Sequence, residues 1–168
     1  MQVSDRKSIV VDNCGYNQFI EELEKLKLES ISIATRGIEE AENAVGDGWH
    51  DNFAFEESMR ESRTIANKIN KMMEEKQTIK VIKKTNLKDE FVNIDDVIKL
   101  EMIYNEDEKE DEIVKLTGKY IPNTETRIKE ITLNSPIGKS IYKKKIGSIS
   151  EYVINDRVIK VKILEKNK

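Results

Sequence analysis

Two long amphipathic stretches fill the first half of the chain. From about Tyr16 to Val45, apolar residues recur at three- and four-residue steps, which is the period of one face of an α-helix. Asp12 or Asn13 precedes this stretch, and either side chain can cap a first helical turn. The pattern predicts one long helix. Its apolar stripe comprises Ile20, Leu23, Ile31, Ala34, Ile38, Ala41 and Val45, with Leu26 and Leu28 on either side.

A second helix is predicted from near Asp51 or Asn52 to about Gln77. Its apolar positions follow alternating steps of four and three residues, which is the spacing of a heptad seam. Gly46 and Gly48 separate the two helices, because glycine adopts the turn conformations that end a helix. Two helices joined by so short a loop must lie antiparallel, as a rod about 40 Å long. The predicted seam comprises Phe55, Met59, Ser62, Ala66, Ile69 and Met73.

The second half of the chain changes to short runs rich in β-formers. These runs cover residues 79–82, 91–100, 100–104, 113–116 and 152–164, and the highly charged residues 105–112 suit a hairpin loop. Between Pro136 and Ile146 we expect a short helix with Ser135 as its N-cap, closed by Lys143, Lys144 and Lys145. The prediction is an α+β protein in which an antiparallel helical hairpin precedes a small antiparallel sheet domain with one short helix.

The expected domain boundaries follow from these patterns. Residues 1–15 form a leader in which Ile9 to Val11 can pair as a strand, residues 16–77 form the hairpin with its tip at 46–52, and residues 78–168 form the sheet domain. A single cysteine, Cys14, excludes an internal disulfide. The sequence has neither a signal pattern nor an apolar run of about 18 residues. We therefore expect a cytoplasmic monomer with no membrane contact.

Charge is unevenly distributed along the chain. The net charge is only −3 and 36% of residues are charged, but residues 1–75 hold 9 Lys and Arg against 16 Asp and Glu. Residues 139–168 hold 9 basic residues against 3 acidic ones. The sequence therefore predicts an acidic hairpin and a basic C-terminal segment. An acidic hairpin argues against direct DNA binding.

The predicted hairpin tip gathers the chemistry-bearing side chains. Asp47 and Asp51 stand there with Trp49 and His50, which are the chain's only tryptophan and only histidine. Packing at a hairpin bend requires none of these residues. A role in chemistry or in contact with a partner is therefore the favoured interpretation of the tip.

Two motifs give the chain a family resemblance. Gly15-Tyr16-Asn17-Gln18-Phe19-Ile20-Glu21-Glu22-Leu23-Glu24-Lys25-Leu26 is similar to an opening G-x-x-x-L-x-x-E-L-x-x-L, with Phe19 in place of the first leucine. Leu133-Asn134-Ser135-Pro136-Ile137-Gly138-Lys139-Ser140-Ile141 is similar to an N-S-P-[LI]-x-x-x-[LI] segment, and Lys145-Ile146-Gly147-Ser148 follows it. In these two motifs and in their order along the chain, the sequence after the leader resembles the Gre-type transcript cleavage factors of bacterial RNA polymerase.

The resemblance implies a coiled-coil hairpin joined to an FKBP-like sheet domain. That domain would dock on the rim of the polymerase secondary channel, with Asn134, Ser135 and Pro136 in the docking segment. The hairpin would enter the channel, where Asp47 and Asp51 help hold Mg²⁺ and orient the water that cleaves the nascent RNA 3′ end of a backtracked complex. On this view the protein is a transcription elongation factor and not an enzyme by itself.

Elementary chemistry agrees with a shared metal ion. Mg²⁺ prefers oxygen ligands in octahedral geometry, and one or two carboxylates can complete a shell that a partner and phosphate oxygens otherwise supply. In two-metal phosphoryl chemistry, the second ion helps to position the nucleophile. Two isolated carboxylates hold Mg²⁺ weakly, so we expect no tight metal binding by the free protein.

The tip departs from the family pattern G-D-x-x-E-N-x-x-Y by one inserted residue. Matched from the left, Asp47 is the family aspartate; matched from the right, Asp51 and Asn52 take the E-N place and Phe55 the aromatic place. Asp51 also stands where the second helix needs an N-cap. A catalytic group displaced by about 1 Å can lose about a hundredfold in rate. The alternative function is therefore a Gre-fold channel regulator that inhibits or modulates the polymerase without cleavage.

Other side chains near the tip have more than one interpretation. Trp49 suits packing across the hairpin end, stacking on a base or wedging into the polymerase channel. His50 suits a solvated loop, a phosphate or RNA contact, or a proton shuttle to the cleavage water. Asn52 is a further candidate for RNA or channel contact. Arg60 and Arg63 suit ion pairing with neighbouring glutamates, or guidance of extruded RNA. A weaker alternative for the whole chain is a prolyl isomerase or chaperone-like module, although the second half has few aromatics to line a proline pocket.

Overall fold

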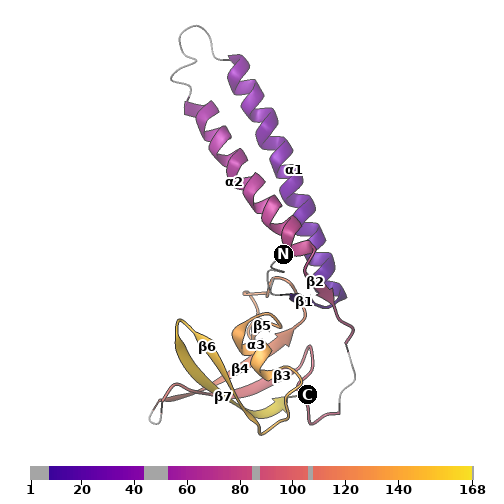
Figure 1. Cartoon of the computed structure of the whole chain (residues 1–168), viewed down its shortest axis with the longest axis vertical. Helices are drawn as coiled ribbons and strands as arrows, with labels where there is room; N and C mark the ends of the chain where they lie inside the picture. Colours follow the sequence, from indigo (N-terminus) through magenta and orange to yellow (C-terminus); the bar gives the residue numbers. More distant parts are fainter. Residues whose placement is uncertain (1–7, 44–52, 85–87, 106–107, 168) are drawn as a thin grey trace, which may run out of the picture. The chain divides into compact units, whose positions relative to one another are not determined.

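The computed structural model describes residues 8–43, 53–84, 88–105 and 108–167. The chain divides into two compact units. The hairpin unit comprises residues 19–43 and 53–79 among those described, and the sheet unit comprises residues 8–18 and 80–167. Helices precede a β-sheet in chain order (Figure 1). The predicted α+β class is confirmed.

The hairpin unit is built from helix α1 (Asn13–Asn43) and helix α2 (Phe53–Lys76). The two helices lie side by side (Figure 1), and the side chains of Arg36 and Glu61 form an ion pair between them. Buried side chains recur at three-, four- and seven-residue spacings, as expected for a coiled-coil seam. They are Phe19, Leu23, Leu26 and Ile33 of α1, and Ser58, Ile65 and Met72 of α2. The predicted antiparallel hairpin is confirmed.

The predicted apolar stripes are only partly the buried ones. Ile31 is 63% exposed and Ile38 60%, whereas Leu26 and Ile33 are buried. On α2, Met59 and Met73 are exposed, and burial falls one position earlier, at Ser58 and Met72. One position corresponds to about 100° around a helix. Each helix carries two apolar stripes, so periodicity identified the helices correctly but assigned the wrong stripe to the seam.

The sheet unit contains a five-stranded sheet in the order β5-β4-β3-β7-β6. Its strands are β3 (Val97–Ile103), β4 (Lys109–Thr117), β5 (Lys129–Thr132), β6 (Ile149–Ile154) and β7 (Arg157–Asn167). β4 and β5 are parallel, and the other pairs are antiparallel. The sheet is therefore mixed, whereas the sequence predicted an antiparallel one. Short strands β1 (Ile9–Val11) and β2 (Ile79–Val81) pair separately.

One face of the sheet carries the core. Alternating residues of β3 (Ile98, Leu100 and Met102) are buried with Val161 and Ile163 of β7. Helix α3 (Pro136–Ile141) packs against β5, β6 and β7 and adds Ile141, which is fully buried. The period-two burial follows from the alternation of side chains across a strand. α3 and its Ser135 cap confirm the predicted short helix.

Three strand predictions were wrong in their boundaries. Residues 91–96 do not extend β3, because Asp95 has a φ of 71° and Asp96 Oδ2 accepts the Asn93 N–H at 2.7 Å, which makes a turn. The predicted charged loop 105–112 is shorter, because β4 begins at Lys109. The run 152–164 is a hairpin, whose turn residues Asn155 and Asp156 both have positive φ, as two-residue type I′ turns require.

Residues 8–18 are tied to the rest of the sheet unit by paired hydrogen bonds. The Asn134 side chain accepts the Val10 N–H and donates to the Val10 carbonyl, both at 2.8 Å. The Gln18 side chain likewise accepts the Ile121 N–H at 3.0 Å and donates to the Ile121 carbonyl at 3.2 Å. The Asp12 side chain accepts the Gly15 N–H at 2.7 Å and so caps α1, as predicted. The first turns of α1 therefore belong to the sheet unit.

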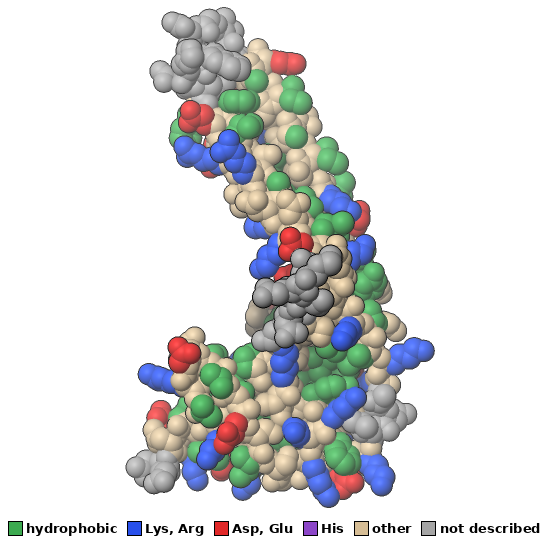
Figure 2. All heavy atoms as spheres, viewed as in Figure 1, with side chains coloured by type: hydrophobic (Ala, Val, Ile, Leu, Met, Phe, Trp, Pro, Cys, Tyr) green, Lys and Arg blue, Asp and Glu red, His purple; other side chains and the backbone are tan. Residues whose placement is uncertain are grey.

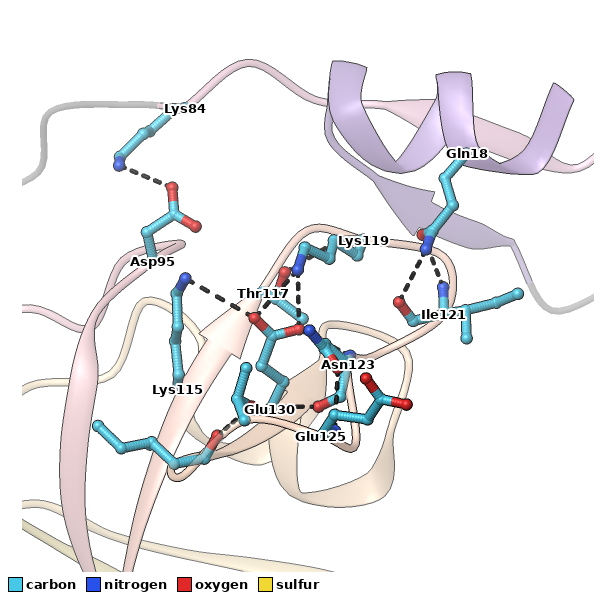
Figure 3. A network of polar contacts seen from close by, with 12 residues as sticks. Gln18, Lys84, Asp95, Lys115, Thr117, Lys119, Ile121, Asn123, Glu125 and Glu130 are labelled. Carbon is cyan, nitrogen blue, oxygen red and sulfur yellow. Dashed lines mark hydrogen bonds and ion pairs between the residues drawn. The ribbon is translucent and has the colours of Figure 1, made fainter. Parts of the chain in front are cut away.

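The loop between β4 and β5 is organised around one buried carboxylate (Figure 3). The Glu130 side chain is only 3% exposed and accepts bonds from Lys119 Nζ at 3.0 Å and the Asn123 N–H at 2.8 Å. Lys115 Nζ lies 3.7 Å from the same carboxylate. Burial alone would raise the pKa of Glu130, but these bonds and charges outweigh it and hold the pKa below its usual value.

Candidate functional site

The ends of the two helices frame the predicted tip. α1 is described as far as Asn43, and α2 begins at Phe53. The predicted metal-binding and contact residues Asp47, Trp49, His50, Asp51 and Asn52 lie outside the described residues. Their assignments therefore stay predictions, and the described site consists of the helical residues that adjoin this segment.

The first turns of α2 carry opposite charges on an exposed surface. Arg60 lies 3.8 Å from Glu56 and 3.7 Å from Glu57, and all three side chains are about half exposed or more. This geometry favours the ion-pairing interpretation of Arg60. Arg63 is exposed, and within the described ranges it has no ion-pair partner. Arg63 is therefore the better candidate of the two for contact with a nucleic-acid phosphate.

Phe53 is a candidate that the sequence reasoning did not single out. It is the first residue of α2 and its side chain is 70% exposed, more than any other large hydrophobic side chain among those described. An exposed aromatic ring offers a flat apolar surface for stacking or wedging against a partner. The sequence signal for Phe53 was its position next to the predicted tip, but Phe55 was the residue matched to the aromatic position of the family pattern.

The predicted docking segment is largely occupied with the protein's own fold. Asn134 holds Val10 through both of its amide atoms. The Ser135 hydroxyl accepts the Gly138 N–H at 3.0 Å and donates to the Thr132 carbonyl at 2.8 Å, so it serves as the N-cap of α3. Pro136 is exposed at the first position of that helix. Of the three residues, Pro136 is exposed, whereas Asn134 and Ser135 are half-buried.

The two sequence motifs meet through β1 and the first turn of α1. Gly15, the first residue of the opening motif, is buried, and a Cβ atom there would lie 2.2 Å from the Gly118 carbonyl oxygen. Asn134 of the second motif bonds Val10, a few residues before Gly15. Both motif positions are therefore explained by close backbone packing in the sheet unit.

Basic side chains gather just after α3. Lys139, Lys143, Lys144 and Lys145 are exposed. Lys145 Nζ lies 3.1 Å from Glu90, and Lys143 Nζ lies 5.2 Å from the centre of the Tyr142 ring. With Pro136, these lysines form a mixed apolar and basic surface that suits an acidic protein partner.

Metal-binding chemistry is not found elsewhere in the described part of the chain. Across residues 8–43, 53–84, 88–105 and 108–167, the structure holds no group of three or more His, Cys, Asp or Glu placed to bind a metal ion. None of the described helices is long and apolar enough to cross a membrane. The predicted Mg²⁺ ligands Asp47 and Asp51 lie outside these ranges.

The fold defines a class of two-unit α+β proteins in which a long helical hairpin precedes a small mixed sheet. No family model matches the chain. It is 28% identical over 162 residues to transcription elongation factor GreA of Thermoanaerobacter pseudethanolicus, and the aligned residues cover 96% of this chain and 99% of that protein. It is also 28% identical over 166 residues to GreA of Acetivibrio thermocellus, with 99% and 100% covered. Over its full length, the chain is therefore similar to GreA transcription elongation factors, as a distant relative.

The solved structures that match the chain have low similarity to it. The structure of the transcription factor Gfh1 is 15% identical, with 96% of this chain and 99% of that one covered and a TM-score of 0.45. A GreA/GreB factor from Nitrosomonas europaea is 15% identical, with 96% and 100% covered and a TM-score of 0.39. The similarity to GreA proteins rests on the sequence matches and not on these superpositions.

Proposed function

We propose that this chain binds bacterial RNA polymerase through the secondary channel and stimulates hydrolytic cleavage of the RNA 3′ end in backtracked complexes. The observation that carries the proposal is the full-length similarity to GreA proteins, which includes both the hairpin and the sheet unit. A pair of helices is only about 20 Å wide, so it can reach an active site that a globular domain cannot enter. The factor would act in the cytoplasm as a stimulator of the polymerase centre and not as a separate enzyme.

The proposed chemical role falls to Asp47 and Asp51. Both belong to the segment that connects the end of α1 to the start of α2. Carboxylates offer the hard oxygen ligands that Mg²⁺ prefers, and the polymerase and RNA phosphate would supply the remaining ligands. The ion would then position the attacking water and stabilise the developing charge. Because the shell is shared, the free protein is expected to bind Mg²⁺ only weakly.

The proposed docking surface is centred on Pro136 and the lysines that follow α3. Asn134 and Ser135 contribute by shaping this surface, because their side chains are engaged with Val10, Thr132 and Gly138. An exposed proline beside basic side chains suits a partner surface that is partly apolar and partly acidic.

A second candidate function keeps the same binding site but omits cleavage. The observation that favours it is the residue inserted between Asp47 and Asp51, relative to the family tip. If this insertion moves one carboxylate by about 1 Å, the rate can fall about a hundredfold. The chain would then occupy the channel and slow the polymerase without shortening RNA.

A transcript cleavage assay separates the two functions. RNA polymerase would be halted in a backtracked complex that contains 5′-labelled RNA, and the full chain would be added with Mg²⁺. We expect the labelled RNA to shorten faster than with polymerase alone. Slower nucleotide addition without shortening would establish the regulator instead. No effect on either rate at saturating protein would contradict both functions.

A further inference from the structure

The hairpin unit has a second apolar surface besides its buried seam. It consists of Ile31, Ala34, Ile38 and Ala41 on α1, and of Phe55, Met59, Ser62, Ala66 and Met73 on α2. These residues follow three- and four-residue steps in both helices, apart from a seven-residue step between Ala66 and Met73, so the surface runs along the hairpin. We call it the open face. Figure 2 shows hydrophobic side chains at the surface of both helices.

The open face contains a hollow between the helices. Its volume is about 430 Å³, and small residues, among them Gly37 and Ser58, line it. Ten residues line the hollow, and only Glu42 carries a charge. A second depression between the helices is polar, and six of its ten lining residues are charged: Glu29, Arg36, Glu57, Arg60, Glu61 and Lys68. The polar depression is therefore lined mainly by charged side chains, whereas the hollow of the open face has Glu42 as its one charged lining residue.

We propose that two copies of this chain associate through the open face, with their hairpins antiparallel. The face holds both parts of a self-complementary interface: a hollow centred near Gly37 and, about two turns away, the protruding side chain of Ile31, which is 63% exposed. A two-fold axis that crosses the hairpin near position 34 exchanges positions 31 and 37. Each Ile31 side chain then enters the hollow of the other copy. Such isologous pairing is the usual form of a dimer.

Charge complementarity supports the same register. The axis that exchanges positions 31 and 37 also places position 27 of one copy opposite position 41 of the other, one residue from position 42. Lys27 and Glu42 are both exposed, so the two side chains can reach each other. Within one copy, Lys27 forms an ion pair with the exposed Glu24, at 3.2 Å. The dimer therefore gains two intermolecular Lys27–Glu42 pairs and places no like charges together at these positions.

The size of the face predicts a weak dimer. Residues 27–42 span about 24 Å of α1, and two helices are about 20 Å wide, so each copy contributes roughly 500 Å². The total of about 1,000 Å² is at the low end for specific interfaces. We therefore expect a dissociation constant in the micromolar range, with a monomer in dilute solution and a dimer at high concentration.

Sedimentation velocity on the free full-length chain tests the dimer. The concentration should range from about 1 µM to about 500 µM, to bracket a micromolar dissociation constant. We expect the mass to rise from 19.5 kDa toward twice that value. Ile31→Glu should weaken association at least about tenfold. Leu28→Glu is the matched control, because Leu28 is 68% exposed on the same helix but lies outside the hollow, and it should leave association unchanged.

A charge exchange tests the register. Lys27→Glu and Glu42→Lys should each weaken the dimer, because each places two like charges together, and the double variant should restore association. Both positions are exposed, so circular dichroism should show unchanged helix content. A monomer at every concentration would overturn the proposal. So would a dimer that neither Ile31→Glu nor the single charge variants weaken. The experiment needs no polymerase, so its outcome is independent of the proposed function.

Discussion

Glu130 shows how a single side chain organises a segment that carries no regular structure. Residues 118–128 connect β4 to the parallel strand β5, and their backbone and side chains converge on its carboxylate. A buried carboxylate is stable only when it is paired and hydrogen-bonded. Lys119, Lys115 and the Asn123 N–H meet this requirement. The loop therefore has a defined conformation because its charges are satisfied at one point.

Replacing Glu130 should destabilise the sheet unit in a pH-dependent way. The pKa of Glu130 lies below its ordinary value of about 4.5, so its stabilisation is complete at neutral pH and is lost as the pH falls through the lowered pKa. Glu130→Gln should lower the free energy of unfolding by about 2 kcal/mol at pH 7 and by less at pH 3. Urea denaturation at both pH values measures this difference.

Glu151→Gln provides the control for Glu130. Glu151 is 58% exposed and lies 3.8 Å from Lys160 on the neighbouring strand. Exposed ion pairs contribute little, so this change should cost less than about 0.5 kcal/mol at either pH. Equal losses for the two variants would contradict the central role of the Glu130 carboxylate.

Local rules explain which residues of the docking segment were predicted correctly. Ser135 and Pro136 were identified as a cap and a first helical residue, because both roles depend on neighbours within three residues. The contact between Asn134 and Val10 spans 124 positions. Nothing in the local sequence signals such a contact. The structure therefore assigns Asn134 a role in folding where the resemblance had suggested only docking.

At the scale of elements, the hairpin was predictable but its buried side was not. The three- and four-residue periodicity established two helices and their antiparallel pairing. Because each helix carries two apolar stripes about 100° apart, the period could not select the stripe that faces the partner helix. β5 was missed for a different reason: its four residues include Lys129 and Glu130, so it has no apolar run. Its parallel pairing also depends on a distant strand.

Alanine substitutions on α2 can distinguish the seam from the open face. Ile65 is 5% exposed and Met59 is 42% exposed, and the two lie on the same helix. Ile65→Ala should lower the free energy of unfolding by about 2–4 kcal/mol, because it leaves a cavity in the seam. Met59→Ala should cost less than about 1 kcal/mol at low protein concentration. Thermal or urea unfolding of the full chain, monitored by helix content, measures both, and a larger loss for Met59→Ala would contradict the assigned seam.

At the scale of the whole molecule, charge is unevenly divided between the two units. Residues 1–7 and 19–79 hold 10 basic and 15 acidic residues, whereas residues 8–18 and 80–168 hold 19 basic and 17 acidic ones. The hairpin unit is thus acidic and the sheet unit slightly basic. An acidic hairpin suits a factor that donates carboxylates to a metal centre and does not compete for nucleic acid along its length.

The candidate site was predicted unevenly from sequence. The tip acids stand within a few residues of one another in the sequence, so Asp47 and Asp51 could be named without any tertiary information. Burial and exposure depend on packing, so they could not be predicted. The structure shows that Phe53 is exposed, that Arg63 has no ion-pair partner among the described residues, and that the Asn134 side chain bonds Val10. Sequence therefore supplied the proposed chemistry, and the fold selected the side chains that can contact a partner.

Cleavage by tip variants on backtracked RNA polymerase complexes tests the central claim most directly. The chain with both Asp47→Ala and Asp51→Ala would be compared with the unaltered protein and with Glu56→Ala, which removes an exposed acid from the first turn of α2. We expect the double variant to bind the polymerase within about twofold of the unaltered protein but to cleave RNA at least about a hundredfold more slowly. We expect Glu56→Ala to keep full activity. Cleavage by the double variant at the unaltered rate would contradict the central claim.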